Sequence, residues 1–264
     1  MSDEQNLALF CDFENVALGV RDAKLDKFDI ALVLERLLLK GTIVTKKAYC
    51  DWDRYKSFKA GMHEASFELI EIPHVRISGK NSADIRMVVD ALDLCYTKEH
   101  IDTFVVISGD SDFSPLVSKL RENAKTVIGV GVRNSTSDLL VTNCDEFIFY
   151  DDLVASTKPR KKSGKKRSKK AKKKTAQSTD KAQEAIDLVV QTTEALYAER
   201  GDKTRLWGSM IKQTLKRRRP GFNESAFGFA SFSDLLEEAA NRGAIELEQD
   251  ERSGGHIIKG VGSG

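Results

Sequence analysis

Two aspartates, Asp110 and Asp112, follow the most apolar strand that the sequence predicts. They stand in the stretch VVISGDSDFSPLV, which begins as a strand, turns at its glycine and resumes in a helical pattern. The four apolar residues 104–107 are typical of a strand buried on both faces, as in a parallel sheet covered by helices. Ligands of such sheets bind beyond the carboxyl ends of the strands. One aspartate before Ser114 and Pro115 can serve as a helix cap. A cap explains only one of the two, so the second aspartate needs another role.

A third aspartate, Asp12, ends the first predicted strand of the chain. In the common doubly wound strand orders the first and fourth strands flank the point where the order reverses, so Asp12, Asp110 and Asp112 are expected to lie close together. Crowded carboxylates raise one another's pKa unless a cation neutralises them. A hard divalent ion, Mg²⁺ or Mn²⁺, suits such oxygen ligands. Asp84, in the first turn of a helix predicted over 82–96, is either a fourth ligand or an acid favourably placed near a helix N-terminus.

Several polar residues near these acids are weaker candidates. Asn15 follows Asp12 by three residues, and it could orient a water molecule or an acid, or cap a helix. Glu14, between them, is expected to face away from the acids or to lie at the rim. Lys80, on a glycine-containing loop, is a candidate phosphate contact, although loop lysines are more often simply solvated. Asp90 lies six residues, nearly two helical turns, after Asp84, so its side chain is expected about a third of a turn around the helix from that of Asp84.

An alternation of strands and helices must position these residues. Strands are expected over residues 7–13, 42–52, 67–75, 104–107, 126–132 and 146–150, with helices over 28–40, 55–66, 82–96, 114–123 and 137–143 between them. This pattern predicts an α/β domain with a doubly wound, mainly parallel sheet of the Rossmann-like type. In the helix over 82–96, the apolar residues expected to face the core are Ile85, Val88, Val89 and Leu92.

The 264 residues carry a net charge of +2, which hides a strong partition of charge. Residues 158–174 hold twelve lysines and arginines and no acid, whereas residues 1–157 hold 18 basic and 26 acidic groups. The basic run has almost no apolar content to offset the entropy of ordering, so we expect a disordered linker over 155–179. Its charge favours a polyanion partner, although a solvated tether or, in a eukaryote, a nuclear import signal fits as well. The candidate phosphate contacts in it are Lys165, Lys166 and Arg167.

Composition and cysteine usage indicate where the protein works. No apolar run approaches the length of a membrane span, and the N-terminus MSDEQN is acidic and polar, unlike a signal peptide. The four cysteines stand singly in apolar stretches, without the close spacing of zinc or redox motifs. We therefore expect a cytoplasmic protein with reduced core cysteines and no membrane partner.

The last third of the chain has a different character. A helix over 179–201, two more helices and a terminal pair of short strands predict a small winged-helix α+β domain over 180–264. Such a domain is a binding architecture. The run KRRR includes Arg217 and Arg218, which either contact phosphates of a polyanion or form a solvated helix end that suits the helix dipole.

Four stretches together resemble an NYN domain of the LabA-like group, which has a PIN-like nuclease fold. They are LALFCDFENV, GKNSADIRMVVDAL, FVVISGDSDFSPLVSKLRENAKTVIGVGV and STSDLLVTNCDEFIFYDDL, and the resemblance covers about residues 5–153 of a first domain placed at 1–154. It implies a metal-dependent ribonuclease site. In that site the acids are Asp12, Asp84, Asp110 and Asp112, with Asn15 and Ser108 as supporting residues and Ser137 as a lower-ranked addition.

The segment of about residues 180–260 is similar to a LOTUS domain, also called OST-HTH. This resemblance implies binding of RNA, with G-rich or structured RNA among the candidates, or docking of a protein partner. Together the two resemblances predict an endoribonuclease that uses Mg²⁺ or Mn²⁺, with the basic linker and the LOTUS domain recruiting RNA. The alternatives are a non-catalytic RNA-binding adaptor and a phosphohydrolase that acts on a small nucleotide.

Overall fold

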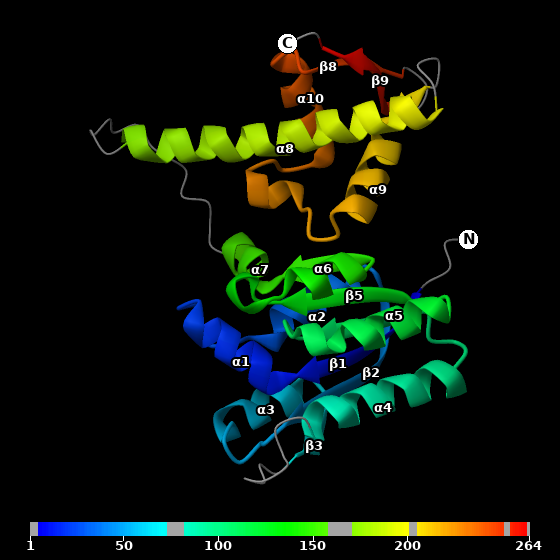
Figure 1. Ribbon diagram of the computed structural model, residues 1–264. Coiled ribbons are helices and arrows are strands. Elements are labelled where there is room, and N and C mark those ends of the chain that lie inside the picture. Colours follow the sequence, from blue (N-terminus) through cyan, green and yellow to red (C-terminus); the bar gives the residue numbers. More distant parts are fainter. Residues whose placement is uncertain (1–4, 73–81, 158–170, 201–204, 251–253, 263–264) are drawn as a thin grey trace. The chain divides into compact units, whose positions relative to one another are not determined.

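The chain divides into two compact units, Met1–Lys158 (unit 1) and Pro159–Gly264 (unit 2). A computed structural model (Figure 1) describes residues 5–72, 82–157, 171–200, 205–250 and 254–262, with side chains of the 171–200 helix described over 181–199. No helix in the described ranges is both long enough and apolar enough to cross a membrane.

Unit 1 contains a six-stranded parallel sheet in the order β3-β2-β1-β4-β5-β6. Its strands are β1 (Gln5–Asp12), β2 (Gly41–Cys50), β3 (Glu68–Glu71), β4 (Thr103–Ile107), β5 (Thr126–Gly131) and β6 (Glu146–Phe149). The strand order reverses between β1 and β4, which pair in parallel with Cys11 opposite Ile107. The predicted doubly wound sheet is therefore confirmed, and its switch point lies between the two strands that lead into the candidate acids.

Helices cover both faces of this sheet (Figure 1). One face packs against α1 (Phe13–Asp22), α2 (Ile30–Leu38), α3 (Lys56–Glu64) and α7 (Tyr150–Thr157), and the other against α4 (Ser82–Thr97), α5 (Ser114–Glu122) and α6 (Asp138–Asn143). The 3₁₀ turns η1 (Ser111–Phe113) and η2 (Arg133–Ser135) lie in the loops after β4 and β5. The sequence did not predict α1 or α7, because each begins at the residue directly after a strand and no turn residues separate the two elements.

The central strands carry continuous apolar runs, residues 7–11 in β1 and 104–107 in β4, because both faces of the sheet are covered. In β1, Leu7 and Leu9 pack into one layer, and Ala8 and Phe10 pack into the other. The same alternation runs through β4. A continuous apolar run thus reports a central parallel strand, as the sequence predicted.

The inward face of α4 differs from the prediction. Met87, Ala91 and Cys95 pack against the sheet, whereas Ile85 and Val89 are exposed. The helix is apolar on two sides, and periodicity alone selected the wrong one for these two residues. Packing of the small Ala91 against the sheet lets the helix approach closely, which favours the observed side.

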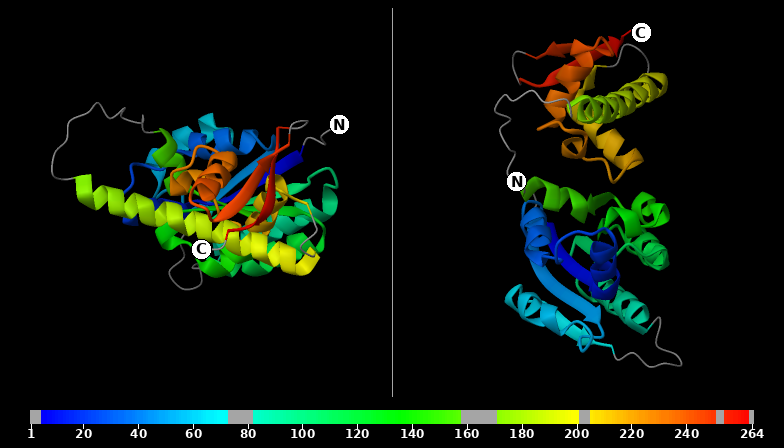
Figure 2. Two further views of the ribbon diagram at one scale, coloured as in Figure 1. Left: turned by 90° about the horizontal axis from the view of Figure 1, so that it is seen from above. Right: turned by 90° about the vertical axis from the view of Figure 1, so that its left-hand side faces the viewer.

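Unit 2 is an α+β unit built around its own core. It contains α8 (Ala171–Arg200), α9 (Gly208–Arg218), η3 (Glu224–Phe227), α10 (Phe232–Asn241) and an antiparallel sheet in the order β7-β9-β8, formed by β7 (Leu206–Trp207), β8 (Ile245–Gln249) and β9 (His256–Val261). The predicted three helices and terminal hairpin are present, and Figure 2 shows the hairpin beside α10. Both ends of the linker predicted over 155–179 are helical, since α7 ends at Thr157 and α8 begins at Ala171.

Candidate active site

A cleft of about 280 Å³ opens at the carboxyl ends of the central strands of unit 1. Three of the four predicted acids, Asp12, Asp84 and Asp110, line it from β1, α4 and the loop after β4. The complete lining is Asp12, Glu14, Asn15, Leu18, Tyr49, Cys50, Asp51, Ile72, Ala83, Asp84 and Asp110. Acids far apart in the sequence are thus gathered at the switch point of the sheet.

Asp12 is the most buried of these acids, and its carboxylate is held from two sides. Ser108 donates its hydroxyl hydrogen to Asp12 Oδ2 over 3.0 Å, and the Asn15 N–H donates to Asp12 Oδ1 over 3.4 Å. The second contact makes Asp12 the N-cap of α1 as well as the last residue of β1. The carboxylate orientation is therefore fixed by the chain itself.

Ser108 and Asn15 also fix the loop that carries Asp110. The Asn15 side-chain oxygen accepts the Gly109 N–H over 2.9 Å, and the Ser108 hydroxyl oxygen accepts the Asp110 N–H over 3.2 Å. The two residues predicted to support the site therefore connect Asp12 to the loop after β4.

Gly109 must be a glycine because another backbone approaches it. A Cβ atom at this position would lie 2.5 Å from the carbonyl oxygen of Ser135. The Gly109 carbonyl accepts the N–H of Ser137 over 2.9 Å, and the Ser137 hydroxyl caps α6 by accepting the Leu139 N–H. Ser137 thus supports the loop after β4 and does not line the cleft.

The carboxylates in the cleft repel one another, and burial adds to this effect. Burial, and then the charge of Asp84, raise the pKa of Asp12 to about 7, against the lowering effect of its bond from Ser108. Burial, followed by the charges of Asp110 and Asp112, raises the pKa of Asp84. The cleft therefore resists accumulating negative charge and favours a cation.

Asp110 and Asp112 differ in their surroundings. Asp110 caps the η1 turn by accepting the Asp112 N–H over 3.0 Å, so the capping alternative applies to it in addition to its place in the cleft. Asp112 is exposed and lines a neighbouring recess with Pro115 and Leu139. It lies at the rim, near enough to Asp84 to affect its pKa.

Two acids of the cleft were missed or ranked low by sequence analysis. Glu14 lines the cleft and forms an ion pair with Arg54 over 3.1 Å. Asp51, the residue directly after β2, also lines it. Asp51 carries the same signal as Asp12, an acid at the carboxyl end of a strand beside the switch point, and this signal could have found it.

The predicted RNA contacts are distributed outside this cleft. Arg217 and Arg218 are exposed in the last turn of α9, in unit 2. The other four, Lys80, Lys165, Lys166 and Arg167, lie outside the described residues.

A family model decides the class of unit 1. The model of the NYN domain matches residues 6–151, which include every acid of the cleft. The chain belongs to the NYN domain family. NYN domains belong to the PIN-like nuclease superfamily, so the family assignment points to a nuclease.

Two other proteins are similar to part of the chain. A crystal structure of a protein of unknown function from Vibrio parahaemolyticus is 26% identical, with a TM-score of 0.51, over 58% of this chain and 97% of that chain. An uncharacterized protein of Methanocaldococcus jannaschii is 30% identical over 145 residues, which are 55% of each chain. The chain thus spans about half the length of this curated relative. Neither name states a substrate.

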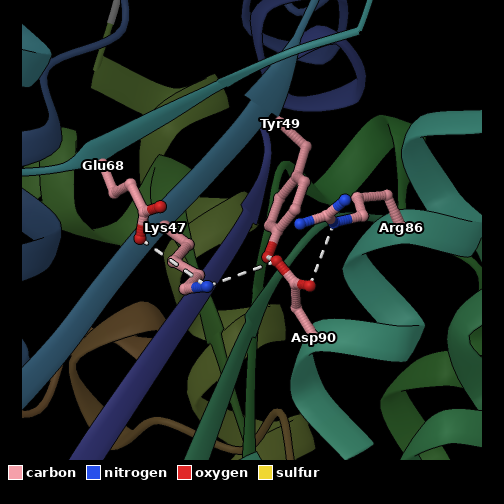
Figure 3. Close-up of polar contacts among 5 residues, drawn as sticks. All are labelled: Lys47, Tyr49, Glu68, Arg86 and Asp90. Atoms are coloured by element: carbon pink, nitrogen blue, oxygen red, sulfur yellow. Dashed lines mark hydrogen bonds and ion pairs between the residues drawn. The ribbon is translucent and has the colours of Figure 1, made fainter. Parts of the chain in front are cut away.

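A second polar cluster anchors α4 to the sheet of the NYN domain (Figure 3). Asp90 accepts a hydrogen bond from Tyr49 Oη over 2.9 Å, and it pairs with Lys47 over 3.3 Å and with Arg86 over 3.0 Å. Its side chain is only 11% exposed. Tyr49 is fully buried, stands opposite Asp12 in the β1–β2 pairing and lines the cleft. The weak candidate Asp90 therefore links β2 to the helix whose first turn carries Asp84.

Asp90→Ala is expected to lower the free energy of unfolding by about 2–4 kcal/mol, because it leaves the buried Tyr49 hydroxyl without its acceptor and Lys47 without its least exposed partner. Chemical unfolding measures the change. Glu68→Ala is the matched control: Glu68 pairs with the same Lys47 but is 63% exposed, so its loss should cost less than about 1 kcal/mol. Equal costs for the two variants would contradict an anchoring role of Asp90.

The donor chemistry of the cleft fits a hard divalent cation, and PIN-like nuclease domains generally use divalent metals. Within the described ranges, no three His, Cys, Asp or Glu side chains are grouped so that they could hold an ion by themselves. Mg²⁺ commonly binds through one or two carboxylates and keeps several waters. Asp12, Asp84 and Asp110 provide carboxylates of this kind, and a cation would relieve the repulsion that raises the pKa of the first two.

Proposed function

We propose that the protein is an endoribonuclease that hydrolyses RNA phosphodiester bonds with Mg²⁺ or Mn²⁺ held at the cleft of its NYN domain. The observation that carries the proposal is the convergence of Asp12, Asp84 and Asp110, from three separate elements, on one cleft in which the pKa values of Asp12 and Asp84 are raised. A nucleic acid polymer is the substrate class that the family and the basic run of residues 158–174 favour together.

Asp12, Asp84 and Asp110 would hold the ion, one or two of them directly and the rest through its waters. When bound, the ion neutralises charge on the scissile phosphate and makes a water molecule more acidic. Ser108 and Asn15 keep Asp12 and the Asp110 loop oriented through their hydrogen bonds, so the ligands need little rearrangement. Asp112, exposed at the rim, either holds a second ion or accepts a proton.

The rim of the cleft also offers a cation to the substrate. Arg54 is half-exposed and pairs with Glu14, which lines the cleft. An incoming phosphate can compete for this guanidinium, because exposed ion pairs are weak and arginine binds phosphate well. We assign Arg54 to phosphate binding beside the acids, with Lys80 as a second contact.

Unit 2 and the basic linker would recruit RNA. The proposal for unit 2 is a LOTUS-like domain that binds RNA, including G-rich or structured RNA, or docks a protein partner. Its helices α8, α9 and α10 with a terminal hairpin are compatible with such a module, and Arg217 and Arg218 at the end of α9 are exposed. Tethering would raise the local concentration of RNA at the cleft. A cytoplasmic site of action is proposed with it, from the single, buried, unpaired cysteines.

The experiment is a cleavage assay on circular single-stranded RNA, duplex RNA and single-stranded DNA, with Mg²⁺, Mn²⁺ or EDTA. Cleavage of the circular RNA, which has no ends, that requires a divalent ion and exceeds cleavage of DNA would support the proposal. RNA binding without turnover under all conditions would instead indicate the non-catalytic adaptor. Hydrolysis confined to small nucleotides would indicate a phosphohydrolase.

Deletion of residues 158–174 is expected to weaken RNA binding and to reduce its salt dependence. Each bond to a phosphate that the deletion removes lowers the slope of log K against log salt concentration by about 0.7 for single-stranded RNA. Fluorescence anisotropy across a salt series measures the slope, and a shuffled tract of the same composition is the control. A slope unchanged by the deletion would show that the run is only a tether.

A further inference from the structure

Helix α4 carries a largely exposed apolar stripe beside its core face. Ile85, Val89 and Tyr96 are 63%, 55% and 60% exposed, and Leu92 between them is half-buried, with part of its side chain packed against the core of unit 1. They are spaced four, three and four residues apart, which places them along one line of a helix as in a coiled-coil seam. A contiguous exposed apolar stripe on a surface helix is typical of an interaction surface.

The stripe is complementary to itself in the antiparallel direction. When a second copy of the helix is reversed about the midpoint of the stripe, Ile85 meets Tyr96 of the second copy and Val89 meets Leu92 of the second copy. Each large side chain thus faces a different one across a two-fold axis, as an isologous interface requires. Each of the four apolar residues of the stripe therefore meets an apolar residue of the second copy.

The charges beside the stripe select the same direction. Arg86 and Asp93 lie seven residues apart and therefore on the same side of the stripe, two turns from each other. Both are exposed. In the reversed pair, Arg86 comes within reach of Asp93 of the second copy, and this happens twice by symmetry. In a parallel pair that flank of the helix would face the opposite flank of the second copy, where Val88 and Cys95 stand, so Arg86 and Asp93 would gain no charged partner across the seam.

We propose that the NYN domain forms an antiparallel homodimer through the outer face of α4. A single helix face lies at the low end of the size range of specific interfaces, so the dimer is weak and depends on protein concentration. Asp84 stands in the first turn of α4, so the two clefts lie at opposite ends of the shared face. The dimer does not depend on the proposed nuclease activity.

The test uses two charge-reversal variants of the full chain, Arg86→Glu and Asp93→Lys, in sedimentation experiments over a wide concentration range. Each variant alone places like charges opposite each other at both symmetric contacts, so its dimer should be at least about tenfold weaker than that of the wild type. An equimolar mixture of the two variants restores opposite charges at both contacts. The mixture should therefore dimerise as well as the wild type, which also shows that both variants are folded.

Two further variants complete the test. Val89→Asp places a charge in the seam and should abolish the dimer. Lys56→Glu, an exposed lysine of α3 outside the stripe, changes the net charge as much as Arg86→Glu does and should leave the dimer unchanged. A wild-type chain that stays monomeric at every concentration would overturn the proposal, as expected if unit 2 or another protein covers α4. A dimer that resists all three α4 variants, or a mixture without rescue, would overturn it as well.

Discussion

Asp12→Asn is expected to reduce metal-dependent RNA cleavage about a thousandfold or more. The introduced amide would keep the size of the side chain and an acceptor for the neighbouring hydrogen bonds, but it lacks the charge that holds a cation. Transition-state stabilisation by a bound metal is worth several kcal/mol, and about 1.4 kcal/mol corresponds to a tenfold change in rate. Single-turnover cleavage of labelled RNA in Mn²⁺ measures the effect, and Asp110→Asn should behave in the same way.

Glu122→Gln is the control for this experiment. Glu122 is an exposed acid at the end of α5 that pairs with Lys119, outside the cleft. Its substitution removes the same charge and should leave the cleavage rate within about twofold, since such surface pairs contribute little. Turnover near the wild-type rate by both Asp12→Asn and Asp110→Asn would refute the assignment of the active site.

The second large effect concerns stability in the absence of metal. The pKa of Asp12 is about 7 in the folded protein against an ordinary value of 3.8. Between these two pH values Asp12 is protonated in the folded state and ionised in the unfolded chain. The unfolding free energy therefore falls as pH rises from about 4 to about 7 and stays low above it. At about 1.4 kcal/mol per pH unit, the loss from this residue is about 4 kcal/mol.

Asp12→Asn removes this loss of stability. It also weakens the hydrogen bond to Ser108 or to Asn15, which lowers the unfolding free energy by about 1 kcal/mol. The variant should be about 1–3 kcal/mol more stable than the wild type at pH 8 in EDTA, with the advantage vanishing near pH 4. Urea unfolding across this pH range measures the difference. Mn²⁺ should stabilise the wild type at pH 8 and have little effect on the variant, because an ion that binds only the folded state shifts the equilibrium toward it. A variant less stable than the wild type at pH 8 would contradict the prediction.

The sequence by itself determined the architecture and the positions of the central acids. Continuous apolar runs marked the central strands, since a strand covered on both faces cannot alternate. Asp12 ends one such strand and Asp110 closely follows another, and the parallel topology brings these strand ends together. Local pattern and topology rules are sufficient for residues of this kind.

Only the tertiary structure decided where the remaining side chains point. Asp112 lies two residues beyond Asp110, yet the intervening 3₁₀ turn places it at the rim, and Glu14 turns toward the cleft where Arg54 pairs with it. The position of Asp90 in α4 is explained by Tyr49 and Lys47, which approach it from strand β2. These directions depend on contacts between residues distant in sequence.

Helix α4 is the clearest case in which the folded structure, and not the sequence pattern, decides which side chains face the core. Its sequence is apolar on two sides, so periodicity identifies the helix but not the side that meets the sheet. Packing of Met87, Ala91 and Cys95 against the strands settles that choice and leaves Ile85 and Val89 on the surface. The physical reason is that a helical pattern fixes which residues share a face, whereas the fit between that face and a particular sheet exists only in the folded protein.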